Sequence, residues 1–116
     1  ALFVAEYKRL EEIKEILQKK LSGVEYVFSS EYYMEILKEG VNKGSAVKKV
    51  LEESGVSKDE AMAFGDHWND KEMLQYVKYG YLMGNAPENL KEVFDKEKII
   101  AANNEDGVAQ ILEKLI

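Results

Sequence analysis

The sequence contains no cysteine among its 116 residues, which excludes disulfide bonds and any chemistry that uses a thiolate. It has no apolar run of about 18 residues or more, so we expect no membrane-spanning helix. The opening segment, ALFVAEYKRLEE, has too short an apolar stretch and the wrong flanks for a signal peptide. The chain also lacks an initiator methionine, and we therefore expect it to begin inside a longer polypeptide.

An excess of positive charge is absent as well, because 22 acidic residues outnumber 16 basic ones and give a formal net charge of −6. The two kinds of charge are interleaved, which argues against a nucleic-acid-binding surface. An anionic substrate is still compatible with this charge, since a nearby lysine and a metal ion can outweigh distant acids. Apolar residues make up 46% of the chain, enough for the core of about one domain.

The N-terminal third predicts a β-hairpin with a helix against it. Residues 6–21 have leucine or isoleucine at a spacing of three and four, with charged residues between, which is typical of an amphipathic helix. Residues 24–28 and 32–37 are strand candidates, and the Ser-Ser-Glu between them suits a turn.

From residue 39 onward, helical and strand patterns alternate. Strands are predicted over residues 61–64, 79–83 and 99–102, with helices before, between and after them. The first strand, Ala-Met-Ala-Phe, is apolar throughout, which is typical of a strand buried on both faces. The order αβαβαβα predicts the α/β class, with a parallel sheet covered by helices.

The last two predicted helices have recognisable beginnings. Pro87 suits the first position of a helix whose apolar face would carry Leu90, Val93 and Phe94. Residues 103–106, Asn-Asn-Glu-Asp, offer a cap and an acidic first turn for the final helix. The apolar face of that final helix would consist of Val108, Ile111, Leu112 and Leu115.

Polar side chains gather where the strand at 61–64 ends. Asp66, Asn69 and Asp70 follow this strand, and ligands of α/β proteins bind at the carboxyl edge of the sheet. Asp66 and Asp70 are hard oxygen donors of the kind that Mg²⁺ prefers. Simpler roles are equally open, namely a turn residue for Asp66, a helix cap for Asn69 and an acidic first turn for Asp70.

Three further residues have two interpretations each. Lys43, beside Gly44 at a helix start, is either an exposed lysine near a turn, which the pattern alone favours, or a cation directed at an anion. His67 is the only histidine and is more simply an exposed turn residue than a catalytic group. Asn85 follows the second parallel strand, where a plain turn is favoured over a role in bracing the site.

Four segments in a fixed order resemble one known family. They are VNKGSA at 41–46, FGDHWNDKEML at 64–74, MGNA at 83–86 and NEDGVA at 104–109. Together, from about residue 10 to the end, they are similar to the carboxy-terminal part of a Cof-type (type IIB) phosphatase of the haloacid dehalogenase (HAD) superfamily. The resemblance implies that residues 1–38 end an α/β cap domain and that residues 39–116 form the C-terminal half of a Rossmann-like HAD core.

Members of this family are Mg²⁺-dependent phosphatases of small phosphorylated metabolites, often sugar phosphates, so the resemblance implies a cytoplasmic metabolic enzyme. Carried over by position, Asp66 would be a Mg²⁺ ligand and Asn69 would contact the phosphoryl group or the substrate. Lys43 would be a catalytic residue that binds the phosphoryl oxygens and stabilises their charge. Asp70, also catalytic, would orient Lys43 and support the metal site.

The nucleophilic half of the family's site is absent from this sequence. The family uses an aspartate as nucleophile and a second aspartate two residues later as acid and base, and no two aspartates here have that spacing. The serine or threonine of a second motif is absent too. We therefore expect the chain alone to be inactive, with the strand at 61–64 as an open edge that a missing N-terminal half or a second copy covers. The alternative is a non-catalytic structural or interaction module that retains the fold.

Overall fold

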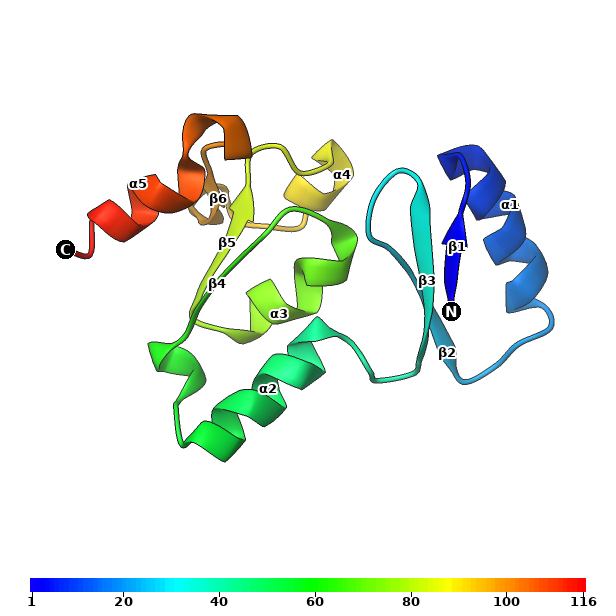
Figure 1. Cartoon of the computed structure of the whole chain (residues 1–116), viewed down its shortest axis with the longest axis horizontal. Helices are drawn as coiled ribbons and strands as arrows, with labels where there is room; N and C mark the ends of the chain where they lie inside the picture. Colours follow the sequence, from blue (N-terminus) through cyan, green and yellow to red (C-terminus); the bar gives the residue numbers. More distant parts are fainter. The chain divides into compact units, whose positions relative to one another are not determined.

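A computed structural model describes all residues, 1–116, and divides into two compact units, Ala1–Asn42 and Lys43–Ile116. Each unit has its own sheet (Figure 1). Each also has its own buried apolar core. None of the helices combines the length and the apolar character that a membrane span requires.

The first unit contains an antiparallel sheet of three strands. Strand β2 (Val24–Phe28) pairs with β3 (Tyr33–Lys38) as a hairpin, which confirms the prediction. Strand β1 (Leu2–Val4) pairs with the other edge of β3 and was not predicted. Three residues are too few to show the alternation of apolar and polar side chains by which a strand is recognised.

Helix α1 (Tyr7–Gln18) contributes to the core of the first unit, as its amphipathic pattern predicts. Its Leu10 is fully buried together with Met34 of β3, and Phe28 of β2 is 8% exposed. These three side chains come from the helix and from both strands of the hairpin. Their burial therefore fixes the helix against the sheet.

The second unit contains a parallel sheet of three strands in the order β4-β5-β6, which confirms the predicted α/β class. Strands β4 (Met62–Gly65), β5 (Tyr79–Met83) and β6 (Ile99–Ile100) run in the same direction. In this register Leu82 lies opposite Ile99. Strand β4 pairs with β5 alone, so its other edge is open.

The prediction that β4 is buried on both faces is wrong. All four of its residues keep intermediate exposure, whereas Leu82 on the central strand β5 is fully buried. The ring of Phe64 stacks on the ring of Tyr81 of β5, with 5.7 Å between the ring centroids. Because β4 has no second neighbouring strand in the chain, its outer edge is not covered by the sheet.

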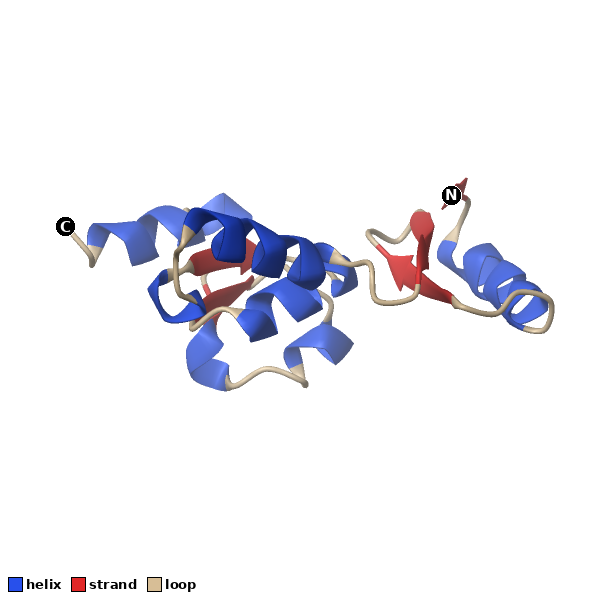
Figure 2. Ribbon diagram, turned by 90° about the horizontal axis from the view of Figure 1, so that it is seen from below, coloured by secondary structure: helices blue, strands red, loops and turns tan.

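Helices flank the parallel sheet of the second unit (Figure 2). Helix α2 (Lys43–Ser54) packs against α3 (Lys71–Tyr76), and α3 packs against β4 and β5. Leu74 of α3 joins Leu82 and Leu90 in the core. This packing places the start of α2 and the start of α3 beside each other, close to the end of β4.

The last two helices are shorter than predicted. Helix α4 (Glu88–Lys91) follows Pro87 as its N-cap residue and ends before Val93 and Phe94, so these two side chains are not part of a helix face. Helix α5 (Gly107–Glu113) carries the predicted apolar residues up to position 112. Two members of its predicted face remain exposed, Leu112 at 43% and Leu115 at 65%.

Candidate active site

The four candidate site residues all lie in the second unit, near the carboxyl end of β4. Asp66 directly follows the last residue of β4. Asn69 and Asp70 belong to a 3-10 turn, Trp68–Asp70, that leads into α3. Lys43 is the first residue of α2, and its ammonium group contacts the carboxylate of Asp70.

The carboxylate of Asp70 is the buried centre of this group, because its side chain is only 7% exposed. Its Oδ1 accepts a hydrogen bond from Nζ of Lys43 at 2.5 Å. Its Oδ2 accepts hydrogen bonds from the backbone N–H groups of Asp66 at 2.9 Å and His67 at 3.3 Å. These partners offset the cost of burying a charge, and they tie Lys43 to the turn after β4.

The geometry bears differently on the simpler roles that the sequence left open for three of these residues. Asp70 is the acidic residue of the 3-10 turn, and its side chain accepts a hydrogen bond from the backbone N–H of the N-cap residue His67, so its simpler role is compatible with its contact to Lys43. Asn69 lies inside the 3-10 turn and not at a helix cap. Lys43 is exposed, as its simpler interpretation expects, and it also forms an ion pair with Asp70.

Two glycines make room for this arrangement. A Cβ atom on Gly65 would lie 2.5 Å from Cβ and 2.7 Å from Oδ2 of Asp70. A Cβ atom on Gly44 would lie 2.8 Å from the backbone carbonyl carbon of Glu72 on α3. Only glycine allows approaches this close. Gly44 thereby lets α2 begin next to α3, which brings Lys43 to Asp70.

Asp66 is exposed, and one of its two carboxylate oxygens accepts a hydrogen bond from another side chain. Its Oδ2 accepts a hydrogen bond from Nδ2 of Asn85 at 3.2 Å, and Oδ1 has no partner in the chain. Asn85 follows β5 in the chain, and its own Oδ1 accepts a hydrogen bond from the backbone N–H of Asn103 at 2.9 Å. Asn85 thus links segments that follow all three parallel strands, since it contacts Asp66 after β4 and Asn103 after β6.

The residues present fit one part of a magnesium site. The chain has no group of three or more acidic, histidine or cysteine side chains that could hold a metal ion together. Mg²⁺, however, is commonly held by one or two carboxylates, with water and substrate phosphate as its other ligands. The unpaired Oδ1 of Asp66 is a hard oxygen donor that suits this role.

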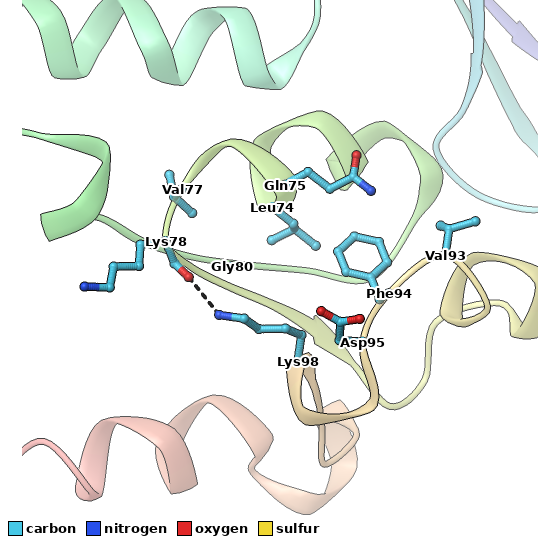
Figure 3. A pocket seen from close by; sticks show the side chains of 9 residues that line it. All are labelled: Leu74, Gln75, Val77, Lys78, Gly80, Val93, Phe94, Asp95 and Lys98. Carbon is cyan, nitrogen blue, oxygen red and sulfur yellow. Dashed lines mark hydrogen bonds between the residues drawn. The ribbon is translucent and has the colours of Figure 1, made fainter.

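A separate pocket of about 320 Å³ opens at the opposite end of the same sheet (Figure 3). Its lining includes Leu74, Gly80, Phe94 and Lys98. Nζ of Lys98 donates a hydrogen bond to the backbone carbonyl oxygen of Lys78 at 2.7 Å. Both lysines directly precede a strand, so this pocket lies at the amino edge of the sheet and contains none of the four candidate residues.

Comparison with known proteins settles the family. Residues 1–112 match the family model described as haloacid dehalogenase-like hydrolase. The chain belongs to this family. The resemblance to the carboxy-terminal part of a Cof-type HAD hydrolase, which the four sequence segments indicated, is thereby confirmed.

Two curated relatives of this HAD-family chain are named as phosphatases. A putative phosphatase of Haemophilus influenzae is 37% identical over 111 residues, which are 96% of this chain and 42% of the relative. An HMP-PP phosphatase of Yersinia pseudotuberculosis is 39% identical over 111 residues, which are 95% of this chain and 41% of the relative. The chain therefore spans less than half the length of the curated relatives that it matches.

Solved structures agree with the family. The structure of SMU.1108c from Streptococcus mutans has a TM-score of 0.84 at 32% identity, and the match covers 98% of this chain and 43% of that one. A sugar phosphatase of HAD subclass IIB has a TM-score of 0.80 at 25% identity, and the match covers 90% of this chain and 40% of that one. The HAD-like α/β fold expected from the sequence is confirmed.

The sequence alone did not predict the contact between Asn85 and Asp66. The Gly-Asn-Ala segment favoured a plain turn, whereas the amide of Asn85 binds the carboxylate of Asp66. The position of Asn85 could have indicated this contact, because Asn85 follows β5, which is the neighbour of β4 in the parallel sheet. Neighbouring parallel strands end at the same edge, so residues after them come close together.

Proposed function

We propose that this chain is the C-terminal part of a HAD-family phosphatase that hydrolyses phosphomonoesters of small metabolites with Mg²⁺, through an aspartyl-phosphate. In this proposal residues 1–38 end the cap domain and residues 39–116 are half of the catalytic core. The observation that carries it is the ion pair of Lys43 with Asp70, whose carboxylate also binds the backbone of Asp66. The relatives named HMP-PP phosphatase and sugar phosphatase support the substrate class.

Lys43 would bind the phosphoryl oxygens. An ammonium group has three N–H donors, and Asp70 uses one of them here, which leaves two for an anionic substrate. Half of the side-chain surface of Lys43 is exposed, so an anion can reach it. Asp70 would keep the ammonium group in place before the substrate arrives, and a cation that is already oriented stabilises charge without the cost of reorganisation.

Asp66 and Asn69 would bind the remaining parts of the reacting group. Asp66 would hold Mg²⁺ through the oxygen that Asn85 leaves unpaired. The ion, when bound, supplies positive charge that polarises the phosphoryl group. Asn69 lies in the same turn with intermediate exposure, and its amide would contact a phosphoryl oxygen or the substrate.

The nucleophile would come from outside these residues. Aspartates occur at positions 59, 66, 70, 95 and 106, and no pair has the spacing that the family's nucleophile motif requires. The open edge of β4 is a suitable place for a further strand, because it carries unpaired backbone donors and acceptors next to Asp66. We therefore expect the chain by itself to lack activity.

The test is phosphate release by the full-length polypeptide that contains this chain, assayed on sugar phosphates and on HMP-PP with and without Mg²⁺. We expect Mg²⁺-dependent turnover that falls by about 10²-fold or more in Asp66→Ala, since removal of one charge-stabilising group commonly costs this much. Asp59→Ala is the matched control, because Asp59 is exposed and lies before β4. Turnover by the 116-residue chain alone, abolished by Asp66→Ala, would overturn the expectation of inactivity.

The second candidate is a non-catalytic module that retains the HAD fold. The observation that favours it is the open edge of β4 together with the exposed Leu112 and Leu115, which suit binding of another polypeptide. Under this interpretation Lys43 and Asp70 only stabilise the turn after β4. A full-length polypeptide that folds, binds no Mg²⁺ and releases no phosphate from any substrate would support the module.

A further inference from the structure

Asn85 connects the ends of β5 and β6 to the exposed carboxylate of Asp66. We propose that Asn85 is a positioning residue, which binds Oδ2 of Asp66 and so leaves Oδ1 as the oxygen that takes Mg²⁺. The inference rests on the proposed function and adds to it a residue that the chemistry does not touch directly. The three groups involved come from positions 66, 85 and 103, each just after a different strand of the parallel sheet.

The backbone that supports Asn85 is itself held in place. The N–H of Asn103, which donates to Asn85 at 2.9 Å, begins the 3-10 turn Asn103–Glu105. The side chain of Glu105 closes this turn, because its Oε2 accepts a hydrogen bond from the N–H of Ala102 at 3.0 Å. The donor that orients Asn85 is therefore preorganised by bonds within its own turn.

The chemistry of the three groups fixes which way the amide of Asn85 points. The backbone N–H of Asn103 can only donate, and an ionised carboxylate such as that of Asp66 can only accept. The amide oxygen of Asn85 must therefore face Asn103, and its nitrogen must face Asp66. An aspartate at position 85 would offer Asp66 no donor and would oppose it with a like charge.

Asp66 is thus held at two points. Its backbone N–H is bound by Oδ2 of Asp70 at 2.9 Å, and its side chain is bound by Nδ2 of Asn85 at 3.2 Å. Without Asn85 the exposed side chain of Asp66 would sample several rotamers, and binding of a metal ion would have to select one of them. Residues that orient a metal ligand in this way commonly change metal affinity by about 10- to 100-fold when they are mutated.

The test is calorimetric titration of Mg²⁺ into the full-length polypeptide without substrate, for the wild type and Asn85→Ala. We expect about tenfold weaker Mg²⁺ binding, at the lower end of that range because the hydrogen bond is exposed. The melting temperature without metal should stay unchanged, and kcat should recover at saturating Mg²⁺. Asn89→Ala is the matched control, since Asn89 is an exposed asparagine on α4 and should leave Mg²⁺ binding unchanged.

A second variant, Asn85→Leu, keeps the approximate size of the side chain and removes both polar ends. It should weaken Mg²⁺ binding as much as Asn85→Ala does, and an affinity equal to that of the wild type would overturn the inference. Equal Mg²⁺ affinity of the wild type and Asn85→Ala would overturn the inference alone and leave the proposed function intact. A wild type that binds no Mg²⁺ would instead overturn the proposed function, and the inference with it.

Discussion

The side chain of Asp70 fills the space that a Cβ atom on Gly65 would need, since that atom would lie 2.5 Å from Cβ of Asp70. The last residue of β4 and the last residue of the following 3-10 turn are therefore in direct contact. This contact allows the carboxylate of Asp70 to reach back to the N–H groups of Asp66 and His67. A glycine at position 65 is thus required for the packing of Asp70 against the end of β4.

Gly65→Ala should displace Asp70 and lower the free energy of unfolding by about 1–3 kcal/mol, the usual cost of forcing extra atoms into a packed site. The measurement is urea denaturation of the 116-residue chain. The control is the same substitution in the background Asp70→Gly, which removes the Cβ atom that the added methyl group would strike. An equal loss in both backgrounds would show that Asp70 is not the obstacle.

Lys43→Met keeps the aliphatic stem of the side chain and removes its ammonium group, which leaves the buried carboxylate of Asp70 with its two backbone donors. We expect the free energy of unfolding to fall by about 1–2 kcal/mol, because a buried charge loses one partner while the site stays open to water. Urea denaturation measures the change.

The matched control for this substitution is Lys48→Met on the same helix. Nζ of Lys48 lies 4.0 Å from Oε1 of Glu52, and both side chains are more than half exposed, at 57% and 64%. Its loss should stay within about 0.5 kcal/mol, as for most exposed ion pairs. Losses of the same size for Lys43→Met and Lys48→Met would contradict a special role for the buried carboxylate.

Leu112→Glu tests whether a further part of the protein covers the exposed face of α5, where Leu112 is 43% exposed. In the 116-residue chain the change should reduce self-association without loss of stability, as sedimentation velocity and urea denaturation would record.

In the full-length polypeptide Leu112→Glu should lower the free energy of unfolding by about 1–3 kcal/mol, because a charge would then be buried in an interface. Ala109→Glu, an exposed position on the same helix, is the control. A monomeric wild-type chain, or equal effects of the two substitutions, would argue against a covered face.

The local sequence was sufficient for most elements because their patterns are strong. The strand Tyr79–Met83 has the predicted bounds, and the hairpin and helix α1 were also predicted. The errors lie where a short segment depends on its neighbours. Strand β1 exists because the edge of β3 is available to it, and α4 ends at Lys91 although apolar residues continue beyond it.

The candidate site was predicted as a set of residues and not as a set of contacts. The residue types after β4 and the resemblance to a family indicated Lys43, Asp66, Asn69 and Asp70. Which simple role each residue would take stayed open, since a turn, a cap and a metal ligand use the same side chains. In the structure Asp70 combines two of these roles, because its carboxylate closes the 3-10 turn and also binds Lys43.

From residue 39 onward, the order of the main helices and strands, the parallel sheet and the residues at its carboxyl edge could be predicted from sequence, because they follow from hydrophobic period and local backbone preference. The contact of Lys43 with Asp70, 27 positions apart in the chain, and that of Asn85 with Asp66, 19 positions apart, were seen only in the folded structure. Such contacts depend on the strand order and on how closely helices approach each other, and no local pattern of residues encodes those distances. The half-buried state of β4 has the same origin, since burial depends on which strands stand beside it.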